Sequence, residues 1–254
     1  MSGHSKWSQI KRQKGAADVK RGQVFSKLSK AITLAAKEGG SQDPSVNYKL
    51  RMVIETAKTY NMPKENIARA VEAGARISGG VSLEEVTYEG FAPAGVAVLV
   101  DVVTDNKNRT LSEIKKVFER GGGTLSGAGS VAWNFEKKGQ ITVKFNGKTP
   151  DEILTIAADS GADDVEILTT VAQIYSTPEK LTQVKEKLIK AGLKIETAEL
   201  TMKPKTVVKV GDSGKARQIL SLVDTLDNLE DVQKVYSNFD IPDEILAKIE
   251  SNNP

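Results

Sequence analysis

Few residues in this sequence have the types and spacing that catalysis or metal binding requires. His4 is the one histidine and there are no cysteines. A serine–histidine–aspartate triad would have to use His4, and a zinc site would lack its usual ligands. Acidic doublets occur at 84–85, 151–152 and 163–164, but adjacent side chains on a helix or strand point in different directions. We therefore predict that the protein is not an enzyme and uses no metal or cofactor.

Two glycine-rich stretches could offer backbone N–H groups to a phosphate. Residues 211–216 (Gly-Asp-Ser-Gly-Lys-Ala) fail the phosphate-binding-loop pattern in spacing and in their last residue, because alanine has no hydroxyl for magnesium. Residues 121–130 contain five glycines and could bind an anion. They could also end a helix and form a flexible turn, and we favour this second interpretation. The turn would lead into a strand at 131–136, and the next strand would be separate, at 140–145.

Positive charge is concentrated at the N-terminal end of the chain. Residues 1–80 hold 15 Lys and Arg against 6 Asp and Glu, a net charge of +9, whereas residues 81–254 have a net charge of −6. Such a field attracts polyanions, and nucleic acid is the usual partner because each neutralised phosphate releases counterions. The expected phosphate contacts are the basic residues of the first thirty positions: Lys6, Lys11, Arg12, Lys14, Lys20, Arg21, Lys27 and Lys30.

Trp7 lies among these basic residues, directly after Lys6. An aromatic ring in basic surroundings can stack on a nucleic-acid base. It could also pack the N-terminal segment against the following helices. Both roles stay open, and we include Trp7 in the predicted nucleic-acid-binding set.

Helical periodicity indicates the elements that would position these residues. Apolar residues recur at helical spacing from 23 to 37. A second helix is expected to carry an apolar stripe that begins at Val46, and Met62-Pro63 is expected to open a third. Short connections between three short helices predict a bundle, which would be the basic nucleic-acid-binding domain, residues 1–80.

The rest of the chain alternates strands with helices. Residues 137–203 have the order β-α-β-β-α-β of the ferredoxin-like fold. Residues 81–136 lack a helix and a strand that residues 204–254 could supply. We therefore predict an α+β protein, in which an N-terminal three-helix bundle is followed by two ferredoxin-like α+β domains, one inserted into the other. The inserted domain would be 137–203, within a discontinuous domain of 81–136 plus 204–254.

The sequence also bears on where the protein acts. No apolar run approaches the ~18 residues of a membrane span, and the N-terminus lacks the apolar core of a secretory signal. The absence of cysteine fits a reducing compartment. We expect a cytoplasmic protein that does not bind a membrane.

Several long motifs resemble those of one family. They are the opening Gly3-His4-Ser5-Lys6-Trp7, the stretch 104–110 (Thr-Asp-Asn-Lys-Asn-Arg-Thr) and the closing stretch 231–239 (Asp-Val-Gln-Lys-Val-Tyr-Ser-Asn-Phe). These motifs resemble the YebC family, also called the PmpR or probable transcriptional regulatory protein family, over essentially the whole chain. The resemblance implies a helical domain followed by two α+β domains, in a cytoplasmic protein that catalyses no reaction.

The resemblance implies two kinds of nucleic-acid partner. Bacterial members are labelled DNA-binding transcriptional regulators, whereas other evidence on the family, including mitochondrial translational activators of cytochrome c oxidase, implies relief of stalling at the ribosome. The sequence has no evident recognition helix with a base-reading cluster of Arg, Asn and Gln. We therefore favour ribosomal RNA over promoter DNA. In that hypothesis, further contacts come from a loop, residues Asn106, Lys107, Asn108 and Arg109. Whether the protein is a monomer or a weak dimer stays open.

Overall fold

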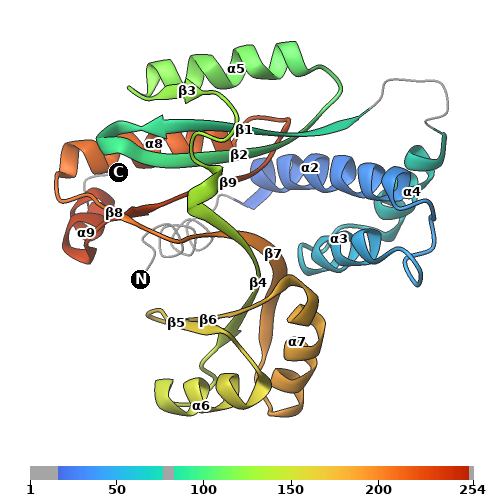
Figure 1. Ribbon diagram of the computed structural model, residues 1–254. Coiled ribbons are helices and arrows are strands. Elements are labelled where there is room, and N and C mark those ends of the chain that lie inside the picture. The colour runs from blue at the N-terminus through green and yellow to red at the C-terminus, as the bar shows by residue number, and fades with distance from the viewer. Residues whose placement is uncertain (1–16, 77–82, 252–254) are drawn as a thin grey trace. The chain divides into compact units, whose positions relative to one another are not determined.

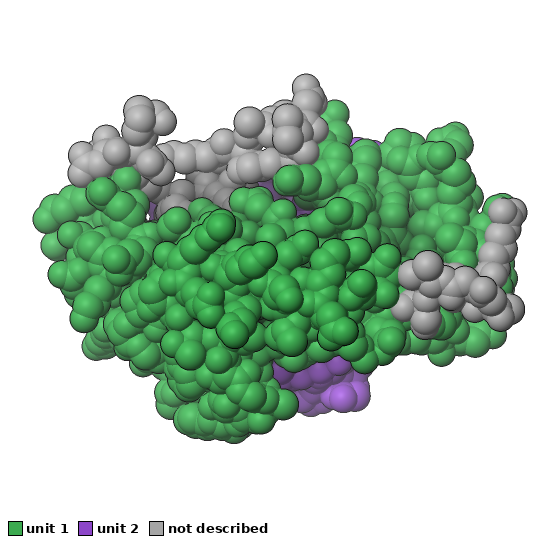
Figure 2. All heavy atoms as spheres, turned by 90° about the horizontal axis from the view of Figure 1, so that it is seen from above, with its two compact units in different colours: residues 1–57, 62–135, 204–254 green, residues 58–61, 136–203 purple. Residues whose placement is uncertain are grey.

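The computed structural model describes residues 17–76 and 83–251. Contacts between residues divide the chain into two compact units, which Figure 2 colours separately. The first unit comprises residues 1–57, 62–135 and 204–254, and the second comprises 58–61 and 136–203. No helix within the described ranges is long and apolar enough to cross a membrane.

Helices α2, α3 and α4 form the helical part of the first unit (Figure 1). Their bounds are α2 (Ala17–Glu38), α3 (Tyr48–Thr59) and α4 (Lys64–Arg76). They share a core that includes Ile32, Leu50 and Ile67. A Cβ on Gly74 would lie 2.5 Å from the carbonyl oxygen of Thr33. Only glycine therefore permits α2 and α4 to approach this closely.

The start of α3 differs from the prediction. The side-chain oxygen of Asn47 accepts a hydrogen bond of 3.0 Å from the backbone N–H of Leu50, and its amide donates one of 2.9 Å to the carbonyl of Ala35. Val46 lies before the helix and is 73% exposed. The prediction that Val46 begins the apolar stripe was wrong, because the buried Asn47 connects α2 to α3.

A four-stranded antiparallel sheet completes the first unit, in the order β3-β1-β2-β9. Its strands are β1 (Glu84–Ala92), β2 (Val96–Thr104), β3 (Thr124–Ser126) and β9 (Val232–Ser237). Helices α5 (Lys107–Arg120) and α8 (Ser213–Asp227) place Phe118 and Leu222 in one core with Val100 of β2. Helix α2 also contacts β2 and β9. The central strand β2 is therefore almost wholly buried, as its valine-rich sequence indicates.

The second unit has the ferredoxin-like arrangement. Its sheet has the order β5-β6-β4-β7, and its chain order is β-α-β-β-α-β. The elements are β4 (Phe135–Lys144), α6 (Pro150–Ser160), β5 (Asp164–Ile167), β6 (Val171–Ser176), α7 (Leu181–Lys190) and β7 (Ile195–Pro204). Thr149 and Glu152 form a reciprocal capping box at the start of α6. Ile141, Ile153 and Leu188 are buried between the sheet and the helices.

The segment around residue 135 also differs from the prediction. The strands expected at 131–136 and 140–145 form a single strand, β4, which follows a 3-10 turn at Ala132–Asn134. Gly139 lies inside this strand, where a Cβ would be 2.8 Å from Oγ of Ser176. This glycine marks a close approach of side chain to backbone and not a break between strands.

Short elements close the first unit. Strand β8 (Val208–Lys209) pairs in parallel with β10 (Phe239–Asp240). Helix α9 (Asp243–Ser251), which was not predicted, adds Leu246 and Ile249 to the core of the first unit. The acidic Asp243 in its first turn is typical of a helix start.

These elements confirm the predicted α+β fold, with a helical N-terminal region followed by antiparallel sheets. The sequence of the second unit lies inside that of the first, because α8 and β9 come after it in the chain. The division into three domains stays a prediction, since residue contacts group the helices with the first sheet. The boundary expected after residue 80 falls within 77–82, outside the described residues.

Candidate nucleic-acid interface

The predicted nucleic-acid-binding residues fall into two groups. Arg21, Lys27 and Lys30 lie on α2, and Arg21 is exposed. Lys20 also belongs to α2, but its side chain lies outside the described part of the structure. The remaining predicted contacts precede the described residues: Lys6, Trp7, Lys11, Arg12 and Lys14.

Lys27 and Lys30 contact acidic residues near the end of α8. Lys27 Nζ donates a hydrogen bond to the carbonyl of Asp227 and lies 3.9 Å from its carboxylate. Lys30 Nζ lies 3.0 Å from Glu230 and 2.8 Å from Asp231. The two lysine side chains are only 15% and 21% exposed. In the structure these contacts join α2 to the end of α8 and to the segment before β9.

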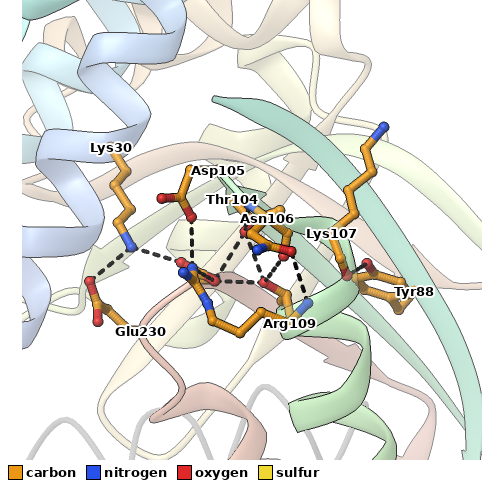
Figure 3. A network of polar contacts seen from close by, with 10 residues as sticks. Lys30, Tyr88, Thr104, Asp105, Asn106, Lys107, Arg109 and Glu230 are labelled. Carbon is orange, nitrogen blue, oxygen red and sulfur yellow. Dashed lines mark hydrogen bonds and ion pairs between the residues drawn. The ribbon is translucent and has the colours of Figure 1, made fainter. Parts of the chain in front are cut away.

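Asp231 is the centre of this network and is 3% exposed. Figure 3 shows Lys30, Thr104 and Arg109, which contribute to the same network. Besides Lys30, its carboxylate accepts hydrogen bonds from Thr110 Oγ1 at 2.6 Å, Arg109 at 2.8 Å and Thr104 Oγ1 at 3.1 Å. Burial alone would raise the pKa of Asp231, but the hydrogen bonds from Lys30, Thr110 and Arg109 outweigh it and hold the pKa well below its usual range. Asp231 is therefore ionised at neutral pH and balances two cations.

The loop before α5 provides the other side of the network. The side chain of Asn106 caps α5 by accepting a hydrogen bond of 3.1 Å from the backbone N–H of Arg109. Arg109 bonds to Asp105 at 2.7 Å as well as to Asp231, and these two carboxylates raise its pKa. Lys107 forms an ion pair with Glu84. Of the four residues predicted as loop contacts, Asn106, Lys107 and Arg109 thus have partners within the chain.

Asn108 is the fourth of these residues and is exposed in the first turn of α5. The hydroxyl of Ser112 donates a hydrogen bond of 2.8 Å to its backbone carbonyl. Within the loop, the side chain of Asn108 is exposed and so is that of Lys107, which is 52% exposed beside its ion pair with Glu84, so both could reach an external ligand.

The glycine-rich stretch is held by a carboxylate of the chain itself. Glu89 on β1 is 6% exposed and accepts hydrogen bonds from the backbone N–H groups of Gly129 (2.7 Å), Val131 (2.7 Å) and Ala132 (2.9 Å). Burial opposes its ionisation, but these three donors lower the pKa of Glu89. Of the stretch 121–130 considered for an external anion, the N–H group of Gly129 therefore binds an internal one.

The sequence reasoning missed Glu89, Asp231 and the two threonines as functional groups. Asp231 and the two threonines lie in stretches that resemble the YebC family. Their partners are far away in sequence, so spacing alone could not reveal them. Across residues 17–76 and 83–251, no group of three or more His, Cys, Asp or Glu is placed to hold a metal ion.

The described chain is a helical region with basic residues, followed by two four-stranded antiparallel sheets covered by helices. Comparisons with known proteins identify the class of protein that has this arrangement. The protein-family model described as "TACO1/YebC protein N-terminal domain" matches residues 5–76 of the sequence. A second family model, described as "TACO1/YebC second and third domain", matches residues 83–239. The chain belongs to the TACO1/YebC family. The resemblance of its sequence motifs to this family is confirmed.

Similar proteins match over nearly the whole chain. One from Dictyoglomus thermophilum is 51% identical over 98% of this chain and 100% of its own length, and one from Herpetosiphon aurantiacus is 49% identical over 98% of each chain. Both are named probable transcriptional regulatory protein. The crystal structure of a conserved hypothetical protein from Aquifex aeolicus is 46% identical, with a TM-score of 0.84 over 91% of this chain and 94% of that one.

Proposed function

We propose that this protein is a non-enzymatic, cytoplasmic regulator of gene expression that binds nucleic acid through its basic N-terminal region. The observation that carries the proposal is the charge asymmetry, +9 over residues 1–80 against −6 over the rest. A positive end attracts phosphates, while the acidic remainder limits non-specific adhesion. The regulatory names of the relatives support the same class of function.

The basic residues assigned to this role lie at the N-terminal end of the chain. The proposed contacts are Lys6, Trp7, Lys11, Arg12, Lys14, Lys20 and Arg21. Lys27 and Lys30 give up ion pairs with Asp227, Glu230 and Asp231 if they bind phosphate. We therefore propose that Lys27 and Lys30 anchor α2 and contribute little to affinity.

The proposed partner is ribosomal RNA, with the protein acting as a translation factor that relieves stalling. Phosphate and shape recognition suits the basic N-terminal region better than base reading, which requires a helix that presents Arg, Asn or Gln to the major groove. The second candidate is promoter DNA, and the names of the relatives favour it. Both candidates depend on phosphate contacts, so salt must weaken the binding of either one.

Salt dependence tests the shared part of the proposal. If six phosphates are neutralised, the logarithm of the association constant should fall against the logarithm of salt concentration with a slope of about −5 for duplex nucleic acid. The measurement is a titration of labelled ribosomal RNA helix and of DNA duplex at several salt concentrations. A slope near zero would contradict the electrostatic proposal for both partners.

Two substitutions on α2 separate phosphate contacts from anchors. Arg21→Ala should weaken binding and reduce the salt slope by about one, because it removes one phosphate contact. Lys27→Met should leave the affinity within about twofold and lower the midpoint of thermal unfolding, because it removes the contacts with Asp227. The opposite result, an unchanged affinity for Arg21→Ala and a weakened one for Lys27→Met, would reverse the assignment.

A further inference from the structure

The largest exposed aromatic side chain in the described ranges is that of Trp133, in the 3-10 turn before β4. It is 67% exposed. An indole is usually mostly buried, since its burial stabilises a fold more than that of almost any other side chain. Its exposure here therefore calls for a reason outside the packing of the core.

Hydrogen bonds hold the indole of Trp133 and the backbone before it. Its indole N–H donates a hydrogen bond of 3.0 Å to the carbonyl of Ser130. The residues before it are fixed because Glu89 binds the N–H groups of Val131 and Ala132. The polar edge of the ring is thus satisfied within the chain. The ring is rigid, and binding a ligand on it costs little side-chain entropy.

The residue after Trp133 fixes a second segment beside it. Asn134 is 3% exposed, and its side-chain oxygen accepts hydrogen bonds from the backbone N–H (3.0 Å) and hydroxyl (2.7 Å) of Thr206. Lys205 donates from its backbone N–H to the carbonyl of Asn134 at 2.7 Å and from Nζ to the carbonyl of Trp133 at 2.9 Å. An ammonium group is therefore tethered to the backbone of the residue that carries the exposed indole.

The local charge indicates what kind of ligand fits. The segment 204–211 holds Lys205 and Lys209, both exposed, and no acidic residue, although residues 81–254 together have a net charge of −6. A rigid exposed aromatic ring beside lysines is the combination that binds single-stranded nucleic acid, because the ring stacks on a base and the ammonium groups meet phosphates.

We propose that Trp133 and Lys205 form a second nucleic-acid contact, at which an unpaired base stacks on the indole and its phosphate binds the lysine. This inference rests on the proposed function and adds to it. The N-terminal region supplies attraction to the phosphate backbone, and the Trp133 contact selects segments with unpaired bases. Stacking tolerates any base, so the contact carries little sequence specificity.

Trp133 fluorescence tests the contact directly. The chain has two tryptophans, so the Trp7→Phe variant leaves Trp133 as the only indole. Titration with a short oligoadenylate should quench its emission, whereas a fully paired RNA duplex should leave the emission unchanged. In a separate titration of labelled oligoadenylate, read from the label, Trp133→Ala should weaken binding by about fivefold to a hundredfold, and Trp133→Phe should retain most of the affinity.

Val207→Ala is the matched control, because Val207 is exposed (42%) in the neighbouring segment but cannot stack on a base. It should bind oligoadenylate as the parent does. Unchanged emission, or equal affinity for Trp133→Ala and Trp133→Phe, would overturn the Trp133 contact. The proposed function would still stand in that case if the parent protein binds nucleic acid in a salt-dependent way. Loss of a concentration-dependent dimer in Trp133→Ala would assign the ring to a second copy of the chain. Failure of the parent to bind any nucleic acid would overturn both proposals.

Discussion

Replacement of Asp231 by asparagine should lower the free energy of unfolding by about 2–4 kcal/mol. The carboxylate is buried and binds Lys30, Arg109, Thr104 and Thr110. Hydrogen bonds to a buried charge contribute about 1.5–3 kcal/mol each, and removing one partner of a buried ion pair costs about 3–5 kcal/mol. The loss should lie toward the lower end because Lys30 and Arg109 are partly exposed and can be hydrated. Thermal and urea unfolding measure the change.

The same variant should respond differently to acid. The folded-state pKa of Asp231 lies below that of the unfolded chain, about 3.9 for an aspartate. Its stabilising contribution is therefore complete above that value and is lost as the pH falls through it toward the folded-state pKa. The difference in stability between the parent and Asp231→Asn should be largest near neutral pH and should shrink below about pH 4.

Glu230→Gln is the control for this prediction. Glu230 pairs with the same lysine at 3.0 Å, but its side chain is 76% exposed. An exposed ion pair contributes about 0–1 kcal/mol, so this variant should change the stability little. Equal effects of the two substitutions, or an effect of Asp231→Asn below about 1 kcal/mol, would contradict the role assigned to the buried carboxylate.

Replacement of Glu89 by alanine is expected to have an effect of similar size, about 2–4 kcal/mol. It would leave the N–H groups of Gly129, Val131 and Ala132 without their acceptor, and a buried polar group without a partner costs about 1–3 kcal/mol. Water can reach the more exposed part of the loop, which limits the total. The amide hydrogens of these three residues should exchange much faster in the variant, and hydrogen exchange measures this directly.

Glu85→Ala provides the comparison on the same strand. Glu85 is half-exposed and pairs with Lys49 at 2.9 Å, so its removal should change the stability by less than about 1 kcal/mol and leave amide exchange in the glycine-rich stretch unchanged. If Glu89→Ala exchanged no faster than Glu85→Ala, the carboxylate would not be what orders the loop.

Local patterns predicted the elements that have a regular period. The apolar spacing in α2 and the valine-rich run of β2 indicated a helix and a buried strand, because burial imposes those periods on the sequence. Glycine was less informative. Gly139 could have been a turn residue, but it lies inside β4 where a side chain would meet Ser176. Glycine occurs both in turns and where another segment of the chain packs closely. Which of the two applies depends on the residues that lie beside it in the fold, and local sequence does not contain that information.

The site was harder to predict than the fold. The stretch 104–110 contains polar side chains at close spacing, and the sequence favoured an external ligand for them. In the structure, Arg109 and Thr110 bind Asp231, which lies more than a hundred positions later. Net charge predicts that a region is basic, but it cannot predict which lysines are neutralised by acids from another segment, as Lys27 and Lys30 are.

Sedimentation of the protein from a cell lysate through sucrose gradients, at low and high salt and with and without nuclease, tests the proposed role most directly. The protein should migrate with ribosomes at low salt and leave them at high salt. Lys11→Glu with Arg12→Glu should abolish the association, whereas Lys187→Glu with Lys190→Glu, on the exposed face of α7, should not. Protein that stays at the top of the gradient at every salt concentration would contradict the ribosomal role and leave promoter DNA as the partner to test.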